Sequence, residues 1–243
     1  HQSGGSIDGN VRTRQRAFWI ARAGEAVFIR SRRCRTLSPR RFGTDGGADA
    51  TVRLYDQHLH TWFSTDSKAD PAANVRRALE AGLAGLTFTD HFDTHPVETD
   101  VCRYDYDRLA ETVASLRQEY GDRIFIGHGI EVCYQRDQMD RILAFVEPRR
   151  FDLVLLSVHW FDGRALHMRE HWDGIDTSAA TRGYLEAVLE AVRFVGELGR
   201  QGRRPFDVLG HLDLVKRYTH RYFEQFDVRS HAGLVDEILA ECL

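Results

Sequence analysis

The chain has 243 residues, a formal net charge of −3, 42% hydrophobic residues and 28% charged residues. This profile is typical of a globular protein of one α/β domain, with or without an appendage. No apolar run approaches the roughly 18 residues that a membrane-spanning helix needs. No secretory apolar segment is present, and the four cysteines form no C-x-x-C pair, so we expect reduced thiols in a cytoplasmic protein: Cys34, Cys102, Cys133 and Cys242.

Residues 1–50 differ from the rest of the chain in charge. They contain ten arginines, three aspartates and one glutamate, a net charge of +6, which leaves −9 for residues 51–243. Their hydrophobic pattern has no sustained period, although the apolar part between Ala17 and Ile29 could form a short helix or a hairpin. A nucleic-acid-binding arm, a transit-like peptide and a gene-boundary remnant remain open. We expect a basic, poorly ordered extension over 1–50 and the folded domain over 51–243.

From Val52 onward, an apolar strand-like run followed by a helical period recurs five times. The first predicted helix has Asp70 as its N-cap, Pro71 at its first position and Gly82 at its end. Uninterrupted apolar strands that alternate with helices predict a parallel sheet covered on both faces. The expected strands are 52–60, 86–89, 124–132, 151–158 and 206–209, and the expected helices are 71–81, 105–120, 136–146, 178–198 and 228–241.

Side chains that bind metals stand where these strands end. His58 and His60 occupy positions i and i+2 at the end of the first strand, so their rings point to the same face. A doubly wound sheet binds its ligand at one crevice, whereas an α/β barrel uses the ends of all its strands. Five successive strand ends therefore favour a barrel. The candidate metal residues are His58, His60, Asp66, His91, Glu131, His159 and His211.

Imidazole and carboxylate ligands suit Zn, Mn and Fe, and a carboxylate can bridge two cations. Clustered cations lower the pKa of a shared water and hold the attacking and leaving oxygens of an in-line displacement. Each of these residues alone could be structural. Together, in phase at five strand ends, they predict a metal cluster for the hydrolysis of phosphate esters or amides.

Five short motifs carry a family resemblance. They are D-x-H-x-H at Asp56–His60, T-D-H at Thr89–His91, G-I-E-V at Gly129–Val132, S-V-H at Ser157–His159 and G-H-L-D at Gly210–Asp213. In their order and spacing, residues 54–243 resemble the PHP (polymerase and histidinol phosphatase) superfamily. The segment Leu212–Tyr218 indicates the histidinol-phosphatase branch. The resemblance implies an α/β fold, a distorted (β/α)7 barrel of which about five β/α units are present.

The resemblance also implies a trinuclear site of divalent metals, Zn, Mn or Fe. His58 and His60 would bind the first metal, and Glu131 would bridge it to the second. His159 and His211 would complete the second metal, and His91 and Asp66 would bind the third. Glu131 and His159 are the expected catalytic residues in the hydrolysis of L-histidinol phosphate to L-histidinol and phosphate, a step of histidine biosynthesis. Arg217 and Lys216, with Arg164 as a weaker candidate, would hold the phosphate.

One departure from the family pattern concerns the closing strands. The family ends with a strand that carries an S-D-A-H type motif, and no D-x-H follows His211 in the 243 residues. We therefore expect weak or absent activity of the chain as it stands. The alternatives are a PHP phosphoesterase acting on nucleotides or DNA ends, and a non-enzymatic metal-binding module. The charge of −9 on residues 51–243 argues against a nucleic-acid partner, and the absence of a metal-bridging lysine argues against an amidohydrolase.

Overall fold

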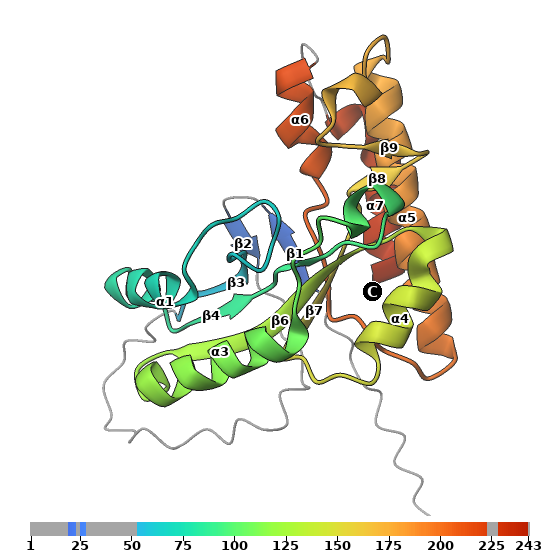
Figure 1. Ribbon diagram of the computed structural model, residues 1–243. Coiled ribbons are helices and arrows are strands. Elements are labelled where there is room, and N and C mark those ends of the chain that lie inside the picture. Colours follow the sequence, from blue (N-terminus) through green and yellow to red (C-terminus); the bar gives the residue numbers. More distant parts are fainter. Residues whose placement is uncertain (1–18, 23–24, 28–52, 223–227, 243) are drawn as a thin grey trace, which may run out of the picture.

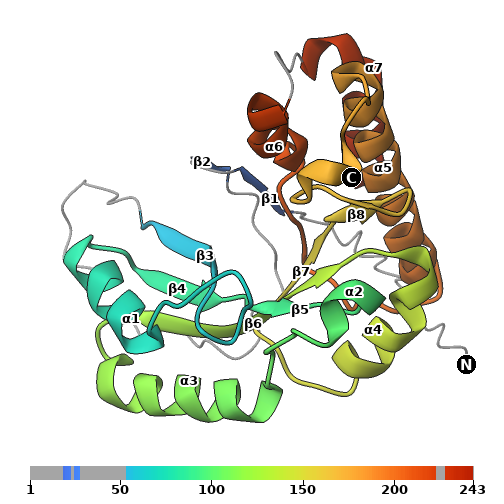
Figure 2. The same ribbon diagram turned by 45° about the horizontal axis from the view of Figure 1, so that its top comes forward.

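The computed structural model describes residues 19–22, 25–27, 53–222 and 228–242 (Figure 1). Its centre is a parallel sheet in which five strands lie side by side in chain order. These strands are β3 (Tyr55–Leu59), β4 (Gly85–Phe88), β6 (Phe125–Cys133), β7 (Leu153–Ser157) and β10 (Val208–Leu209). The short strand β5 (His91–Phe92) pairs with β6 beyond the end of β4. The sheet curls between β3 and β10 as an open half-barrel, in agreement with the predicted five β/α units (Figure 2).

Helices follow the strands at the predicted places. The Asp70 carboxylate accepts a hydrogen bond from the Ala72 amide at 3.1 Å and so caps the first helix, which ends before Gly82, a glycine at φ +72°. Side-chain caps open two further helices in the same way, Asp105 for α3 and Asp176 for α5. The helices are α1 (Pro71–Glu80), α3 (Tyr106–Tyr120), α4 (Met139–Val146), α5 (Thr177–Arg200) and α7 (Ala232–Cys242).

Alternation along the strands divides the sheet into two faces. Val154 and Leu156 of β7 are buried in the main hydrophobic cluster with residues of α4 and α5, such as Ile142 and Val188. A second cluster packs Leu86 and Phe88 of β4 against α1 and α3. Side chains at the positions between these core residues point to the opposite face. Glu131 of β6 and Ser157 of β7 occupy such positions.

Several short elements were not predicted, and they lie between the main ones. The one-turn helix α2 (Pro96–Thr99) begins after His95, whose ring accepts from the Val97 amide. Strands β8 (Trp160–Phe161) and β9 (Arg164–Ala165) form a hairpin around Asp162 and Gly163, both at positive φ. The helix α6 (Leu214–Tyr222) follows the last parallel strand, and two predicted helices open with 3₁₀ turns, η1 (Arg136–Gln138) and η3 (Val228–His231).

The basic N-terminal segment contributes two strands to the sheet. Strand β1 (Trp19–Arg22) pairs in parallel with β10, and β2 (Glu25–Val27) pairs antiparallel with β1. The hairpin interpretation therefore holds for the part of 1–50 that the structure describes. The rest of that segment lies outside the described residues, so its separation as an extension stays a prediction.

The described cysteines, Cys102, Cys133 and Cys242, are not joined by disulfides, and Cys34 lies outside the described residues, so the expectation of reduced thiols stays a prediction. Within the described ranges, the search for a helix of sufficient length and apolar character to cross a membrane finds none.

Candidate metal centre

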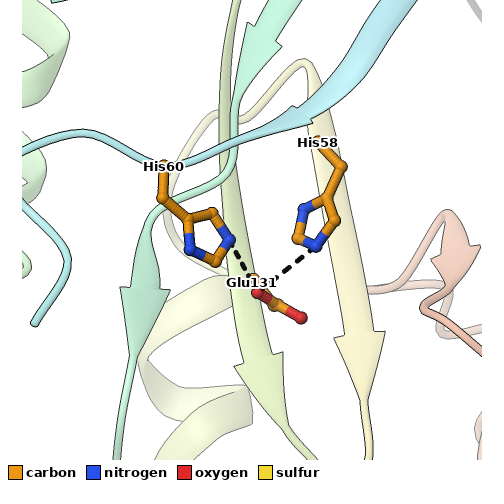
Figure 3. A group of neighbouring side chains, drawn as sticks. All are labelled: His58, His60 and Glu131. Atoms are coloured by element: carbon orange, nitrogen blue, oxygen red, sulfur yellow. Dashed lines mark ion pairs between the residues drawn. The ribbon is translucent and has the colours of Figure 1, made fainter. Parts of the chain in front are cut away.

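Glu131 lies at the middle of the candidate site. Its side chain is completely buried on β6 and points to the face of the sheet opposite the helices, where five histidine rings surround it. His58 and His60, from the end of β3, aim their rings at it (Figure 3). The carboxylate oxygen Oε2 lies 3.0 Å from Nε2 of His60, 3.2 Å from Nδ1 of His91 and 3.7 Å from Nε2 of His58. The other oxygen, Oε1, lies 3.0 Å from Nε2 of His211 and 3.3 Å from Nε2 of His159.

Strand order explains this convergence. His91 is directly opposite Glu131 in the register of β5 and β6. His159 and His211 follow β7 and β10, the next two strands along the sheet. Asp66, in the loop after β3, lies 3.0 Å from Nδ1 of His60 and 3.7 Å from Nε2 of His91 through its Oδ2 atom. The structure thus brings together all seven candidate metal residues of the sequence.

The distances among these side chains fit binding to shared cations better than direct hydrogen bonds from one side chain to another. His60 Nε2 and Glu131 Oε2 are 3.0 Å apart, yet neither atom has a hydrogen-bond partner in the described part of the chain. Buried polar atoms are nearly always paired, so unpaired atoms that face one another indicate ligands that converge on a common ion. Among the residues that the structure describes, three groups have ligand atoms close enough to share one metal: His58, His60 and Glu131; His60, Asp66 and His91; and His91, Glu131 and His159.

Burial and neighbouring charges set the protonation of these groups. Burial lowers the pKa of His58 to about 3 and that of His159 to about 4, against the charge of Glu131. Burial would also lower the pKa of His60, but its hydrogen bond with Asp66 and its contact with Glu131 raise it to about 10. The pKa of Glu131 lies well below its usual range because the surrounding histidines outweigh burial. The ionised Glu131 carboxylate and the neutral rings of His58 and His159 are donors that zinc and similar metals take, whereas His60 would release its proton when a metal binds.

Polar side chains next to the cluster orient its histidines and Glu131, and these roles were not predicted from the sequence. Thr89 Oγ1 lies 2.7 Å from Nδ1 of His58, and the Ser157 hydroxyl donates to Oε1 of Glu131 at 2.6 Å. The buried Asp90 carboxylate accepts from the Thr61 amide at 2.6 Å, which joins the loops after β3 and β4. Strand alternation could have indicated two of them, because Thr89 and Ser157 stand two residues before His91 and His159.

The predicted phosphate-binding residues are less closely tied to the cluster. Lys216 and Arg217 are exposed on α6, which begins three residues after His211. Arg164, on the hairpin strand β9, pairs with Asp162 across the hairpin turn. Their role toward phosphate stays a prediction.

Comparison with known proteins identifies the relatives of this architecture. The family model described as PHP domain matches residues 56–241. A histidinol-phosphatase of Lactococcus lactis is 29% identical over 173 residues, which are 69% of this chain and 59% of the relative. A probable histidinol-phosphatase of Deinococcus radiodurans is 28% identical over 176 residues, which are 69% of this chain and 63% of the relative.

Solved structures agree with the fold. The crystal structure of histidinol phosphate phosphatase from Lactococcus lactis, complexed with Zn, L-histidinol and phosphate, matches with a TM-score of 0.66 and 25% identity. The match covers 78% of this chain and 69% of that one. A structure of the putative histidinol phosphatase from Listeria monocytogenes has a TM-score of 0.61 and 18% identity, and it covers 77% of this chain and 78% of that one. At that identity it supports the fold alone.

Proposed function

The chain belongs to the PHP domain family, and we propose that its histidine and carboxylate cluster is the divalent-metal centre of a histidinol-phosphatase. The observation that carries the proposal is the environment of Glu131. Each of its two oxygens has its own set of imidazole nitrogens within 3.7 Å, as a carboxylate that bridges two cations requires. The relatives named histidinol-phosphatase supply the substrate class, a small phosphorylated amino alcohol.

Three metal positions are proposed, and zinc is the first candidate because the Lactococcus structure contains it. His58, His60 and Glu131 would hold one ion, and Glu131, His159 and His211 would hold a second. His91 and Asp66 would hold the third, with His60 Nδ1 close to the same point. Such ions, when bound, supply Lewis-acid polarisation of the phosphate and acidification of a water molecule.

The residues of the chain then provide position and charge. Glu131 and His159 lie at the centre of the cluster and would fix the spacing between the positions where the attacking oxygen and the phosphate bind. In the reaction, a water oxygen forms a bond to phosphorus, the bond from phosphorus to the ester oxygen breaks, and a proton reaches the departing alcohol. Arg217 and Lys216, or Arg164 after release from Asp162, would offset the negative charge on the phosphate oxygens.

The proposal is tested by phosphate release from L-histidinol phosphate, with the 243-residue chain loaded with Zn²⁺ or Mn²⁺ and its metal content measured. A nucleoside monophosphate and a 5′-phosphorylated DNA oligonucleotide serve as competing substrates. Glu131→Gln should abolish the metal-dependent release, and Glu111→Gln, an exposed change of equal charge on α3, should leave it unchanged. Release from the nucleotides but not from L-histidinol phosphate would contradict the substrate assignment. Weak release is the expected result, and bound metal without any turnover of these esters would favour a metal-binding module.

A further inference from the structure

The position of His211 in the metal centre depends little on the sheet. This histidine follows β10, a strand of two residues, whereas Glu131 lies within β6, a strand of nine residues. A parallel strand is held by the ladder of hydrogen bonds along its length, so a short strand fixes the residue after it less firmly than a long one. Contacts outside the sheet must therefore hold the main chain at His211.

The ring of His211 also lacks a partner on its second nitrogen. His211 is 6% exposed, and its Nδ1 atom makes no hydrogen bond within the described ranges. By contrast, Nδ1 of His58 lies 2.7 Å from Thr89 Oγ1, and Nδ1 of His60 lies 3.0 Å from Asp66 Oδ2. Such a partner usually fixes the ring of a histidine that binds metal. The orientation of the His211 ring therefore depends on how its main chain is held.

Tyr184 of α5 bonds to that main chain. Its side chain is fully buried in the main hydrophobic cluster, and its hydroxyl donates to the carbonyl oxygen of His211 at 2.8 Å. The same carbonyl accepts from the amide of Leu214, the first residue of α6, at 3.0 Å. A carbonyl oxygen has two lone pairs, so both bonds can form together. Tyr184 therefore holds the point at which β10, the metal-site histidine and α6 meet.

Aromatic side chains enclose the ring of Tyr184. Phe161 of β8 lies edge-on to it with the two centroids 6.0 Å apart, and Trp172 lies 5.2 Å from Phe161. A phenylalanine at position 184 would fill almost the same volume in this cluster. What the tyrosine hydroxyl adds to the packing is its bond to His211.

We propose that Tyr184 is a positioning residue of the metal centre, whose hydroxyl holds the His211 main chain so that Nε2 of the ring stays 3.0 Å from Oε1 of Glu131. This inference rests on the proposed function, in which Glu131 and His211 share one metal. Tyr184 acts on the metal only through His211, because its hydroxyl is bonded to the main chain and not to the ring. Loss of the hydroxyl should weaken that one metal position and leave the others unchanged.

The test measures the zinc bound per chain over a series of buffered free Zn²⁺ concentrations, with the 243-residue chain and no substrate. His211→Ala identifies the binding step that depends on His211, and Tyr184→Phe removes the hydroxyl but keeps the ring. The matched control is Tyr134→Phe, since Tyr134 is also buried and its hydroxyl donates to Glu190 of α5 at 3.0 Å, outside the metal centre. A double variant that combines Tyr184→Phe with His211→Ala shows whether both changes act on the same step.

In Tyr184→Phe, the zinc affinity of the step that His211→Ala abolishes should fall by about 10- to 100-fold, as for other partners that orient metal ligands. The remaining steps should be unchanged, and Tyr134→Phe should bind zinc as the parent does. In the double variant, Tyr184→Phe should add nothing to the effect of His211→Ala. An equal loss at every step, or an additional loss in the double variant, would indicate a general structural role and overturn the inference.

The remaining outcomes separate this inference from the proposed function. If Tyr184→Phe fails to fold, Tyr184→Met, which fills the core without a hydroxyl, replaces it with the same expected direction. Zinc binding like that of the parent in the Tyr184 variant, when His211→Ala loses a step, would overturn the inference and leave the proposed function standing. Unchanged zinc binding in His211→Ala would exclude His211 as a ligand and count against both. Failure of phosphate release alone would count against the proposed function only.

Discussion

Thr89 Oγ1 and Nδ1 of His58 are 2.7 Å apart, and this contact fixes the ring that begins the metal centre. With Nδ1 bonded to the threonine, His58 turns its Nε2 atom toward Oε2 of Glu131, 3.7 Å away. Histidine ligands of metals usually have such a partner on their second nitrogen, which sets both the orientation and the tautomer of the ring. The threonine of the T-D-H motif therefore serves the histidine of the neighbouring strand β3.

The first prediction concerns this contact. Thr89→Val preserves the branched shape but removes the oxygen, so the His58 ring loses its orientation and metal affinity should fall by about 10- to 100-fold. Competition with a chromogenic chelator measures the Zn²⁺ affinity. Thr112→Val is the matched control, because Thr112 is a partly exposed threonine on α3 whose hydroxyl donates to the Arg108 carbonyl. Unchanged affinity in Thr89→Val would show that the contact has no part in metal binding.

Ser157 and Gly210 should be energetically coupled. A Cβ atom at position 210 would collide with Oγ of Ser157, the hydroxyl that donates to Glu131 at 2.6 Å. Ser157→Ala and Gly210→Ala should each destabilise the protein, since each disrupts the same buried hydrogen bond. The loss of unfolding free energy in the double variant should be smaller, by about 1 kcal/mol, than the sum of the losses in the two single variants, as measured by urea unfolding. Strict additivity would mean that the alanine at 210 acts through some other contact.

The convergence of the candidate metal residues could be predicted from the sequence because parallel strands end at one edge of a sheet. His58, His91 and Glu131 are far apart in the chain, but their strands are neighbours and their phase is the same. Local signals likewise predicted the ends of the first helix, since Asp70, Pro71 and Gly82 act on backbone close to them in the chain. These features can be predicted from the period of the hydrophobic residues and from the residue types that cap helices.

The surroundings of the segment after β5 could not be predicted in the same way. Asp93 and Glu98 follow β5, a two-residue strand whose pairing depends on β6, and no periodicity marks it. The hairpin around Asp162 and Gly163 carried a readable D-G turn signal. Trp160 of this hairpin stacks on the ring of His95, about 65 residues earlier in the chain. No local sequence pattern predicts such a tertiary contact. The contacts between such loops follow from the three-dimensional structure, because the sheet sets their positions.

Metal removal should lower the stability of the folded chain. A buried carboxylate among five imidazoles is left without its cations when the metal is chelated. Binding to the native state at about 100 times Kd stabilises it by about 2.7 kcal/mol, which corresponds to a rise in Tm of roughly 5–10 °C for a domain of this size. Differential scanning calorimetry with EDTA, and then with excess Zn²⁺, measures the change. In Glu131→Gln the rise should be much smaller, and an equal rise in parent and variant would exclude Glu131 as a ligand.

His128 should make the stability of the protein fall in mild acid. Its ring is buried between Tyr106 and Phe151, its Nε2 atom has no hydrogen-bond partner in the described chain, and burial lowers its pKa to about 4. Below the unfolded pKa of about 6.5, the unfolded chain binds a proton that the native ring does not bind, so stability present at neutral pH is lost as the pH falls toward 4.

His128→Phe removes this proton uptake. Relative to the parent, its free energy of unfolding should improve by about 1 kcal/mol between about pH 7.5 and pH 5. Chemical denaturation at both pH values measures the difference, with the surface change His231→Gln as control. A constant difference between variant and parent at the two pH values would show that His128 titrates alike in the folded and unfolded chain.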